Sequence, residues 1–361
     1  MKRITFLTLI TICFSLLLAG CAVNKLEVVA ELSQAPGNIA VTPDKRIIVS
    51  QHALYMPHYR VVEVLPDGTT TPFPNEEWAT EPGNDGIGLN SVIGIQSDQQ
   101  GIIWMLDNGR GFSRVVAWDS QKNALHKIID VPEPVRVYNS LFNDLALDPV
   151  HNKIYITDMA GPENPAMVIV DMKTGKSRRV LEGHKSAVPE ALPVVIGDKA
   201  MSVDEEGKGK PTIGIDPITI DPESEWVYYG PSQGTSLWRI RTSDLADESL
   251  SDDELASRIE RYGDRPICDG ITMDGEGNVY ITDLTGYAVG VIEPSGKYRV
   301  LHRDEKLLVW PDGMSYGPDN YIYVVTNQLH LSPVFNMGKD LSTLPYYLVS
   351  FKSLGKGKVG R

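Results

Sequence analysis

Apolar and polar residues alternate over short stretches of this chain, and each stretch is followed by a turn and a second apolar run. Within residues 267–283, the alternation from Ile271 to Asp274 has the two-residue period of a half-buried strand. Residues 274–278 contain the glycine, aspartate and asparagine that tight turns favour. Residues 279–282 are β-branched or aromatic, as strands prefer. The segment therefore predicts a β-hairpin.

Five further segments share this pattern of strand, turn and strand. They are residues 37–50, 91–107, 143–158, 216–229 and 312–325. Most are followed by a third and a fourth apolar run. Because one hairpin cannot bury its apolar face alone, the repeat predicts an all-β, six-bladed β-propeller with four strands in each blade.

The two ends of the repeat predict how the ring closes. Residues 26–32 form a strand-like run before the first hairpin, and residues 346–351 form the last one. We expect the N-terminal strand to pair with the last blade, so that the propeller spans residues 26–353. The glycine-rich, basic residues 354–361 predict a flexible tail.

The N-terminal sequence predicts a lipoprotein signal peptide over residues 1–20. A basic start precedes an apolar run that ends in Leu-Ala-Gly before Cys21, which is similar to a bacterial lipobox. Lipidated Cys21 and a linker over residues 21–25 would tether the protein through its acyl chains to the periplasmic face of the outer membrane or to the cell surface. The alternative is an ordinary cleaved signal with a chance cysteine.

Charge and cysteine content narrow the possible functions. The net charge of −13 becomes −15 when Lys2 and Arg3 leave with the signal, which argues against nucleic-acid binding. Of the three cysteines, the signal removes one and lipidation uses Cys21, so Cys268 has no partner for an intrachain disulfide. We expect Cys268 to be buried in the core, with a nucleophilic role as the alternative.

The residues at the start of each inner strand are the main candidates for a functional site, because this position faces the mouth of a propeller's tunnel. The oxygen-bearing side chains at or beside this position are Asn38, Asn143, Asp144, Asp216, Asp269 and Asp312. Crowded carboxylates cannot all ionise without a compensating cation or donor. Ca²⁺ or another divalent cation fits such oxygen ligands, with Asn143, Asp216 and Asp269 as the expected metal ligands. The alternative is that these residues cap turns.

The candidates at the tunnel mouth divide into expected catalytic and expected ligand-binding residues. Asp216 and Asp269 are the expected catalytic carboxylates, whereas Asn38, Asn143, Asp144, Asp312 and His330 are the expected ligand-binding residues. A structural histidine is the alternative for His330. Tyr55, Tyr59 and Tyr138 lie in or beside loops, where they are candidates for contacting an aromatic or amine ligand or for ordinary surface packing.

Residues 230–234 match the G-x-S-x-G pattern of serine hydrolases. That motif requires a strand, a sharp turn and a helix, whereas this sequence predicts strand, loop and strand. The match is therefore interpreted as accidental. The histidines show no H-x-x-H or H-E-x-x-H spacing, so the sequence supports no zinc site. No nucleotide or flavin cofactor is expected.

Several segments resemble the major royal jelly protein/Yellow family, especially its bacterial members with a dopachrome tautomerase-related label. The matching segments are residues 73–78, 103–109, 115–119, 142–148, 155–158, 228–232, 269–270, 310–313 and 327–329. The resemblance implies a six-bladed propeller that binds a small molecule, such as a biogenic amine, in its central channel. It does not imply enzymatic activity, which is not general in that family.

The chain is more distantly similar to the senescence marker protein/gluconolactonase propellers. That resemblance implies a divalent cation held by Glu, Asn and Asp side chains, with Asn143 and Asp269 at matching positions. Asp216 replaces an Asn, and the sequence Ala-Pro-Gly-Asn at residues 35–38 lacks the Glu.

Three functional hypotheses follow. The leading one is a lipid-anchored propeller that binds a small polar or aromatic molecule. The second is a metal-dependent lactone hydrolase or isomerase, and the third is a protein-binding scaffold that would use the long loops at residues 82–88 and 185–210. The sequence identifies no protein partner.

Overall fold

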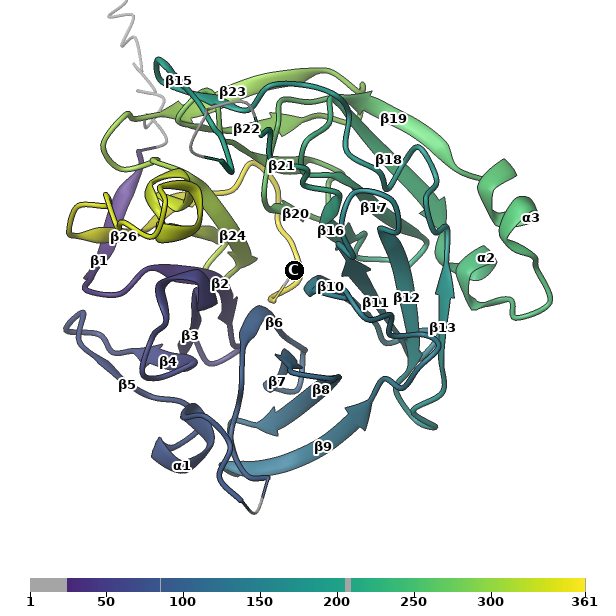
Figure 1. The fold of residues 1–361 in the computed structure, drawn as a ribbon, viewed down its shortest axis with the longest axis horizontal. Coiled ribbons are helices and arrows are strands. Elements are labelled where there is room, and N and C mark those ends of the chain that lie inside the picture. The colour runs from purple at the N-terminus through teal and green to yellow at the C-terminus, as the bar shows by residue number, and fades with distance from the viewer. Residues whose placement is uncertain (1–24, 85, 205–208, 361) are drawn as a thin grey trace, which may run out of the picture.

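The computed structural model describes residues 25–84, 86–204 and 209–360. In this part of the chain, six four-stranded antiparallel sheets surround a central axis (Figure 1). The predicted six-bladed β-propeller is confirmed. The predicted signal peptide, Cys21 and nearly all of the linker lie outside the described residues.

The strands of each blade follow one another from the axis to the rim. Blade 1 contains β2 (Pro36–Val41), β3 (Ile47–Gln51), β4 (Val61–Val64) and β5 (Thr70–Pro72). Blade 2 contains β6 (Val92–Ser97), β7 (Ile102–Gly109), β8 (Phe112–Asp119) and β9 (Ala124–Asp130). Blade 3 contains β10 (Phe142–Asp148), β11 (Lys153–Asp158), β12 (Ala166–Asp171) and β13 (Ser177–Val180).

The second half of the ring repeats this arrangement. Blade 4 contains β16 (Ile215–Ile220), β17 (Trp226–Pro231), β18 (Ser236–Arg241) and β19 (Glu260–Asp264). Blade 5 contains β20 (Ile271–Met273), β21 (Val279–Asp283), β22 (Ala288–Ile292) and β23 (Tyr298–Arg303). Blade 6 contains β24 (Pro311–Tyr316), β25 (Tyr321–Thr326) and β26 (Tyr346–Lys352), and its outer strand is β1 (Glu27–Leu32).

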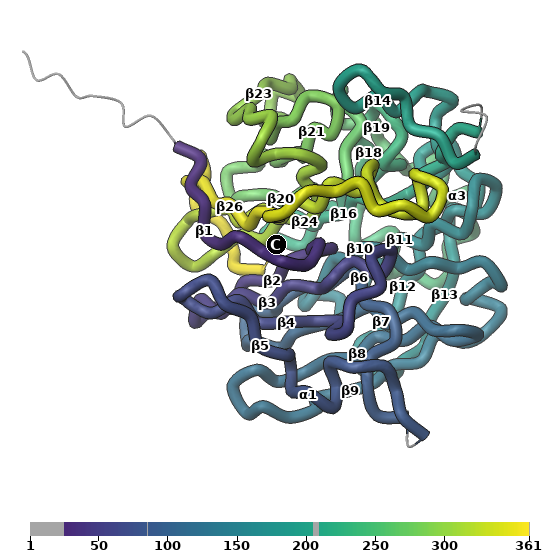
Figure 2. The backbone as a smooth tube through the Cα atoms, turned by 60° about the vertical axis from the view of Figure 1, so that its left-hand side comes forward, coloured from purple at the N-terminus to yellow at the C-terminus, as the bar shows by residue number. Residues whose placement is uncertain are grey.

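The ring closes through both ends of the propeller sequence. Strand β1 pairs antiparallel with β26, from Glu27 opposite Ser350 to Leu32 opposite Tyr346. Figure 2 shows the two strands side by side. This pairing joins the start of the propeller to its last blade, as the terminal apolar runs predict.

The hydrophobic core is divided among the interfaces between blades. Six clusters of buried apolar residues each join two neighbouring sheets. The cluster between blades 3 and 4, for example, brings Tyr155 and Ile169 together with Ile218 and Tyr229. Inner strands are buried on both faces because each lies between two such clusters. This continuous packing fixes where every inner strand begins.

The remaining elements lie in the connections between strands. They are η1 (Ala53–Tyr55), α1 (Glu76–Ala79), β14 (Val195–Ile196), β15 (Lys199–Ala200), α2 (Thr242–Ala246), α3 (Asp252–Ser257), η2 (Leu329–Leu331) and η3 (Pro333–Phe335). Strands β14 and β15 form a separate hairpin in the insertion between blades 3 and 4. Among the described residues, no helix is long and apolar enough to cross a bilayer.

The segment after β26 has a defined course. The sequence predicts a flexible tail here because of its glycine content, whereas the structure shows residues 354–360 turning inward toward the axis (Figure 1). Backbone and side-chain groups on several blades hydrogen-bond to this segment, as described below.

Candidate functional site

Apart from Asp269, which lies just before β20, the candidate aspartates and asparagines lie where the pairing of an inner strand is interrupted near its start. Strand pairing skips two residues after Phe142 in β10, after Ile215 in β16 and after Pro311 in β24. A β-bulge changes the direction of the side chains it contains, and bulges are common beside active sites. The skipped residues are Asn143–Asp144, Asp216–Pro217 and Asp312–Gly313, and Gly37–Asn38 holds the same position in β2.

The blades approach one another closely at this end of the tunnel, which we call the mouth. A Cβ atom on Gly270 would lie 2.3 Å from the carbonyl oxygen of Asp312. One on Gly313 would lie 2.4 Å from Oδ1 of Asn38. Glycine is required at both positions because a side chain would collide with the next blade. The mouth is therefore a narrow ring of backbone and short polar side chains.

Asp216 and Asp269 form a pair of facing carboxyl groups, which we call the acid pair. The charge of each carboxyl group opposes ionisation of the other, so the pair favours a state that holds one proton. The Nδ2 atom of Asn143 donates to Oδ1 of Asp216 at 2.6 Å, and Nε1 of Trp310 donates to Oδ2 of Asp269 at 2.5 Å. Residues from four blades thus meet at one place.

The surroundings of the acid pair separate the roles of its two members. Burial, followed by the charge of Asp269, raises the pKa of Asp216 well above its usual range. Burial also raises the pKa of Asp269, while hydrogen bonds from Asp216 and Trp310 act in the opposite direction. An indole N–H can only donate, so it favours the ionised form of Asp269. These contacts favour Asp216 as the protonated member of the pair and Asp269 as the ionised one.

Two further aspartates complete the acidic mouth. Nδ2 of Asn38 donates to Oδ1 of Asp144 at 3.1 Å, and Nδ2 of Asn327 donates to Oδ2 of Asp312 at 2.5 Å. Burial raises the pKa of Asp144 to about 7, and the charge of Asp269 acts in the same direction. Burial and then the charges of Asp269 and Asp144 raise the pKa of Asp312. The four carboxyl groups therefore influence one another's ionisation.

Trp310 is a site residue that is not among the candidates predicted from the sequence. Its backbone has φ of 54°, a left-handed conformation that is costly for a large side chain. Its ring stacks on His330 with an interplanar angle of 9° and a centroid distance of 5.9 Å. Its position directly before Pro311 and Asp312 is the sequence signal that could have identified it.

His330 is near the acid pair without contacting it directly. Burial, and then the charge of Lys199, lowers the pKa of His330 to about 4, so its ring is neutral at physiological pH. Its Nδ1 atom is buried and has no hydrogen-bond partner among the described residues. The structure therefore places this predicted ligand-binding residue against the ring of Trp310, and not against the acid pair.

The insertion between blades 3 and 4 covers one side of the mouth. Val194, Ile196 and Met201 pack in a buried apolar cluster with Trp310 and Leu329. This cluster leaves Trp310 only 1% exposed. The insertion consequently keeps water from the indole that donates to Asp269.

The three candidate tyrosines have different positions. The hydroxyl of Tyr55 donates to the carbonyl oxygens of Asn327 and Gln328, at 2.9 and 3.0 Å. It therefore supports the loop that carries Asn327. The hydroxyl of Tyr59 lies 3.4 Å from Glu76, and Tyr138 is 89% exposed. Of these tyrosines, only Tyr55 is shown in contact with a mouth residue.

The alternative nucleophiles have no catalytic surroundings. Ser232 is fully buried in the loop between β17 and β18, and its Oγ atom has no partner among the described residues. The strand-loop-strand context is the one predicted from the sequence. Cys268 is also fully buried, and burial raises the pKa of its thiol to about 11. A neutral, enclosed thiol is a poor nucleophile.

The mouth residues do not fit a cation in their present arrangement. Ca²⁺ requires about six to eight oxygen ligands around one point. Here the side chains of Asn143 and Trp310 donate to the acid pair, and that of Asn327 donates to Asp312. Within the described ranges, no group of three or more His, Cys, Asp or Glu residues has a metal-holding arrangement. The predicted metal ligands lie together, but as hydrogen-bond partners.

Larger depressions lie elsewhere on the surface. Grooves of about 720 and 470 Å³ run between the outer parts of blades 2 and 3 and of blades 3 and 4. Neither is lined by the acid pair, Asp144 or Asp312. The concentration of perturbed carboxyl groups, rather than cavity size, identifies the mouth as the candidate site.

Comparison with known proteins gives a family and a set of structural neighbours. The family model described as "Major royal jelly protein" matches residues 90–344, well over half of the chain. Among curated proteins, no sequence matches.

Three solved propellers illustrate the structural similarity. A luciferin-regenerating enzyme is 13% identical, with a TM-score of 0.60 over 93% of this chain and 98% of that one. The calcium-binding protein regucalcin from Agrobacterium tumefaciens is 13% identical, with a TM-score of 0.56 and coverages of 93% and 97%. A gluconolactonase from Xanthomonas campestris is 12% identical, with a TM-score of 0.57 and coverages of 92% and 93%. At such low identity, these similarities support the fold alone.

Proposed function

Because the chain belongs to the major royal jelly protein family, we propose that it is a propeller that binds a small polar or aromatic molecule at its acidic mouth. The observation that carries this proposal is the meeting of Asp216 and Asp269 with the donors Asn143 and Trp310. A ligand with ammonium, amine or hydroxyl groups would supply the donors that these buried carboxyl groups lack.

The charge state of the acid pair suits such a ligand. Ionised Asp269 accepts from a cationic or hydroxyl group, while protonated Asp216 donates to a ligand oxygen or nitrogen. Ligand binding is then expected to alter the protonation of the acid pair.

Isothermal titration against amines, catechols and sugar acids tests this proposal. We expect Asp269→Asn to weaken binding of any ligand found by at least about tenfold, since a charge-assisted hydrogen bond contributes roughly 1.5–3 kcal/mol. Asp253→Asn makes the same chemical change at an exposed position in the first turn of α3 and should leave binding unchanged. Absence of binding, or equal affinities in the two variants, would contradict the proposal.

Lactone hydrolysis is the second candidate function. The gluconolactonase similarity and the unequal protonation of the acid pair favour it. Asp269 would take a proton from the attacking water, and Asp216 would give its proton to the ring oxygen as the ester bond opens. Lactone turnover should be measured with added Ca²⁺ and with a chelator. A protein that hydrolyses no lactone either with added Ca²⁺ or with the chelator would exclude this function.

We also propose an extracytoplasmic setting with lipid attachment at Cys21, based on the lipobox-like sequence. Growth with a labelled fatty acid should label the wild-type protein and leave Cys21→Ser unlabelled. Equal labelling of the two proteins, or no labelling of either, would overturn the assignment.

A further inference from the structure

The first half of the C-terminal segment (residues 354–360) is anchored to the turn between β20 and β21. The backbone N–H of Gly355 donates to Oδ2 of Asp274 at 2.9 Å, and that of Leu354 donates to the hydroxyl of Tyr280 at 2.7 Å. The backbone N–H of Gly275 donates to the carbonyl oxygen of Lys356 at 2.6 Å. This turn lies at the end of the tunnel opposite the mouth.

The second half of the segment reaches three other blades. Nε2 of Gln99 in blade 2 donates to the carbonyl oxygen of Val359 at 2.6 Å, and Nζ of Lys358 donates to the carbonyl oxygen of Pro222 in blade 4. The backbone N–H of Gly360 donates to the carbonyl oxygen of Tyr316 in blade 6 at 2.9 Å. The segment therefore spans the tunnel and holds its position through several blades.

Two glycines allow the segment to lie this close to the ring. At Gly357, a Cβ atom would lie 2.8–3.0 Å from the ring of Tyr316. At Gly360, which has φ of +79°, a Cβ atom would lie 2.1 Å from the carbonyl oxygen of Ser97. Glycine content that predicts flexibility in the sequence here permits close packing instead.

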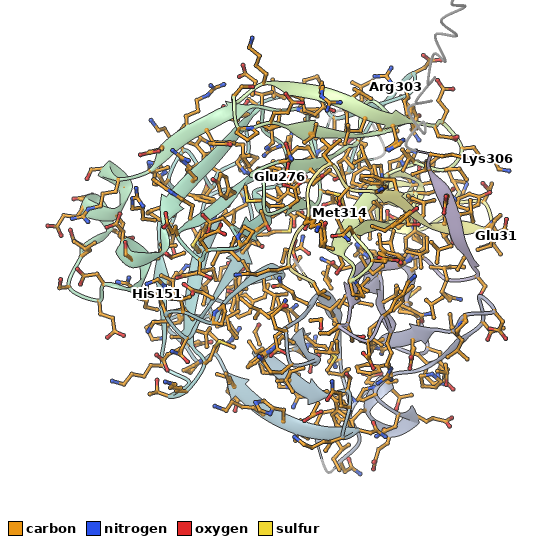
Figure 3. All side chains as sticks on the ribbon, turned by 180° about the vertical axis from the view of Figure 1, so that it is seen from behind. Glu31, His151, Glu276, Arg303, Lys306 and Met314 are labelled. Atoms are coloured by element: carbon orange, nitrogen blue, oxygen red, sulfur yellow. The ribbon has the colours of Figure 1, made fainter. Side chains whose placement is uncertain are left out.

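A narrow cavity connects this segment with the acidic mouth. Its walls carry one apolar side chain from each inner strand, namely Ile39, Ile95, Leu145, Ile218, Ile271 and Met314. Figure 3 shows Met314 near the centre of the ring, away from Glu31 and Arg303 at its periphery. Asn38 and Asp144 line the same cavity as Gly360. Its volume of about 20 Å³ has room for roughly one water molecule.

We propose that the C-terminal segment is an intramolecular plug that closes the far end of the tunnel and keeps bulk water from the acidic mouth. Gly360 forms the floor of the cavity that Asp144 faces. With the plug in place, a ligand can reach the acids only from the mouth. The site is then a blind pocket and not a channel.

The contacts of the plug also make it the part of the tunnel wall that opens most easily. Lys356 and Lys358 are exposed, and Leu354 is 42% exposed, so the plug is held by hydrogen bonds and glycine packing with little apolar burial. Segments with few buried apolar contacts open at a lower free-energy cost than core strands. The plug should therefore open before any blade unfolds.

A matched pair of glycine substitutions tests the plug without any ligand. Gly360→Ala places a methyl group against Ser97, whereas Gly111→Ala adds one at a similar φ of +85° with nothing within 4 Å. Hydrogen exchange is measured in both for the Leu354, Gly355 and Gly360 amides and for the Leu145 amide, which belongs to a residue that lines the cavity. We expect Gly360→Ala alone to speed the exchange of all four amides, by at least about tenfold, because the plug opens more often and water reaches the cavity.

If Gly360→Ala fails to fold, Lys358→Met removes the bond to Pro222 without a clash and should act in the same direction. Wild-type amides that exchange as in an unstructured peptide would overturn the plug. So would unchanged exchange of the Leu145 amide in a variant whose plug amides are unprotected.

Discussion

Two aspartates that flank the short strand β20, Asp269 before it and Asp274 after it, have opposite surroundings. Asp274, at the plug end, is fully buried and accepts hydrogen bonds from the side chains of Asn278 and Tyr280 and from the backbone of Gly355, at 2.8–2.9 Å. Asp269, at the mouth, accepts from the Trp310 indole and faces the carboxyl group of Asp216. One acid is surrounded by donors, and the other shares a crowded acidic site.

This difference separates an acid that stabilises the fold from one that is available to a ligand. Hydrogen bonds from several donors to a buried carboxylate are strengthened by its charge, and they stabilise the folded protein. A buried carboxylate beside three others has few donors to compensate its charge, so it retains the capacity to accept new donors. Residue type and burial are the same in both cases, and only the partners distinguish them.

The largest expected effect is at the plug end. Asp274→Ala leaves several buried donors without an acceptor and should lower the free energy of unfolding by about 3–5 kcal/mol. Chemical denaturation measures this loss. Glu276→Gln, an exposed position in the same turn, should change it by less than about 0.5 kcal/mol. If both variants lost less than about 0.5 kcal/mol in the free energy of unfolding, Asp274 would not differ from Asp269 in its contribution to stability.

The mouth should show the opposite dependence on charge. The pKa of Asp144 is about 7 in the folded protein and close to 4 when unfolded, so the folded state binds its proton more tightly. Its contribution to stability is complete below about pH 4 and is lost as the pH rises to about 7. Asp144→Asn should remove this loss, on the order of 2 kcal/mol with partial exposure considered. Urea unfolding at several pH values between 4 and 8 measures this change. The prediction would be contradicted if the free energy of unfolding changed with pH equally in the wild type and in the variant.

A smaller effect is expected at Trp310. Trp310→Phe retains an aromatic ring against His330 but removes the donor to Asp269, so it should cost about 1 kcal/mol at neutral pH. The pKa of Asp269 should rise, because the lost bond favours its charged form. Denaturation together with a carboxyl NMR titration measures both changes. Loss of stability without a change in the Asp269 titration would assign the indole to packing alone.

Most of the fold could be predicted from the sequence because its repeat is local. Each hairpin carries its own alternation and turn residues, as at residues 271–282, and six copies determine the blade count. The closing role of β1 also follows from its apolar run before the first hairpin. These signals involve residues close in sequence, so they do not depend on knowing the three-dimensional contacts.

The candidate site could be predicted only in part. The positions of Asn143, Asp216 and Asp269 followed from the strand starts, but their partners did not. Trp310 comes from a different blade than the acid it contacts, and its N–H direction depends on a left-handed backbone that no local pattern specifies. The plug was missed because glycines that fit a close contact resemble glycines in a mobile tail.

The closing blade has a consequence for the order of folding. Strand β1 is made before any complete blade, but its partner β26 is made after all the others. Until then β1 is an unpaired strand edge, the kind of surface that joins strands of other chains. Its side chains Glu27 and Glu31 are exposed, and Glu31 lies at the rim in Figure 3. These negative charges discourage such pairing until β26 takes its place beside β1.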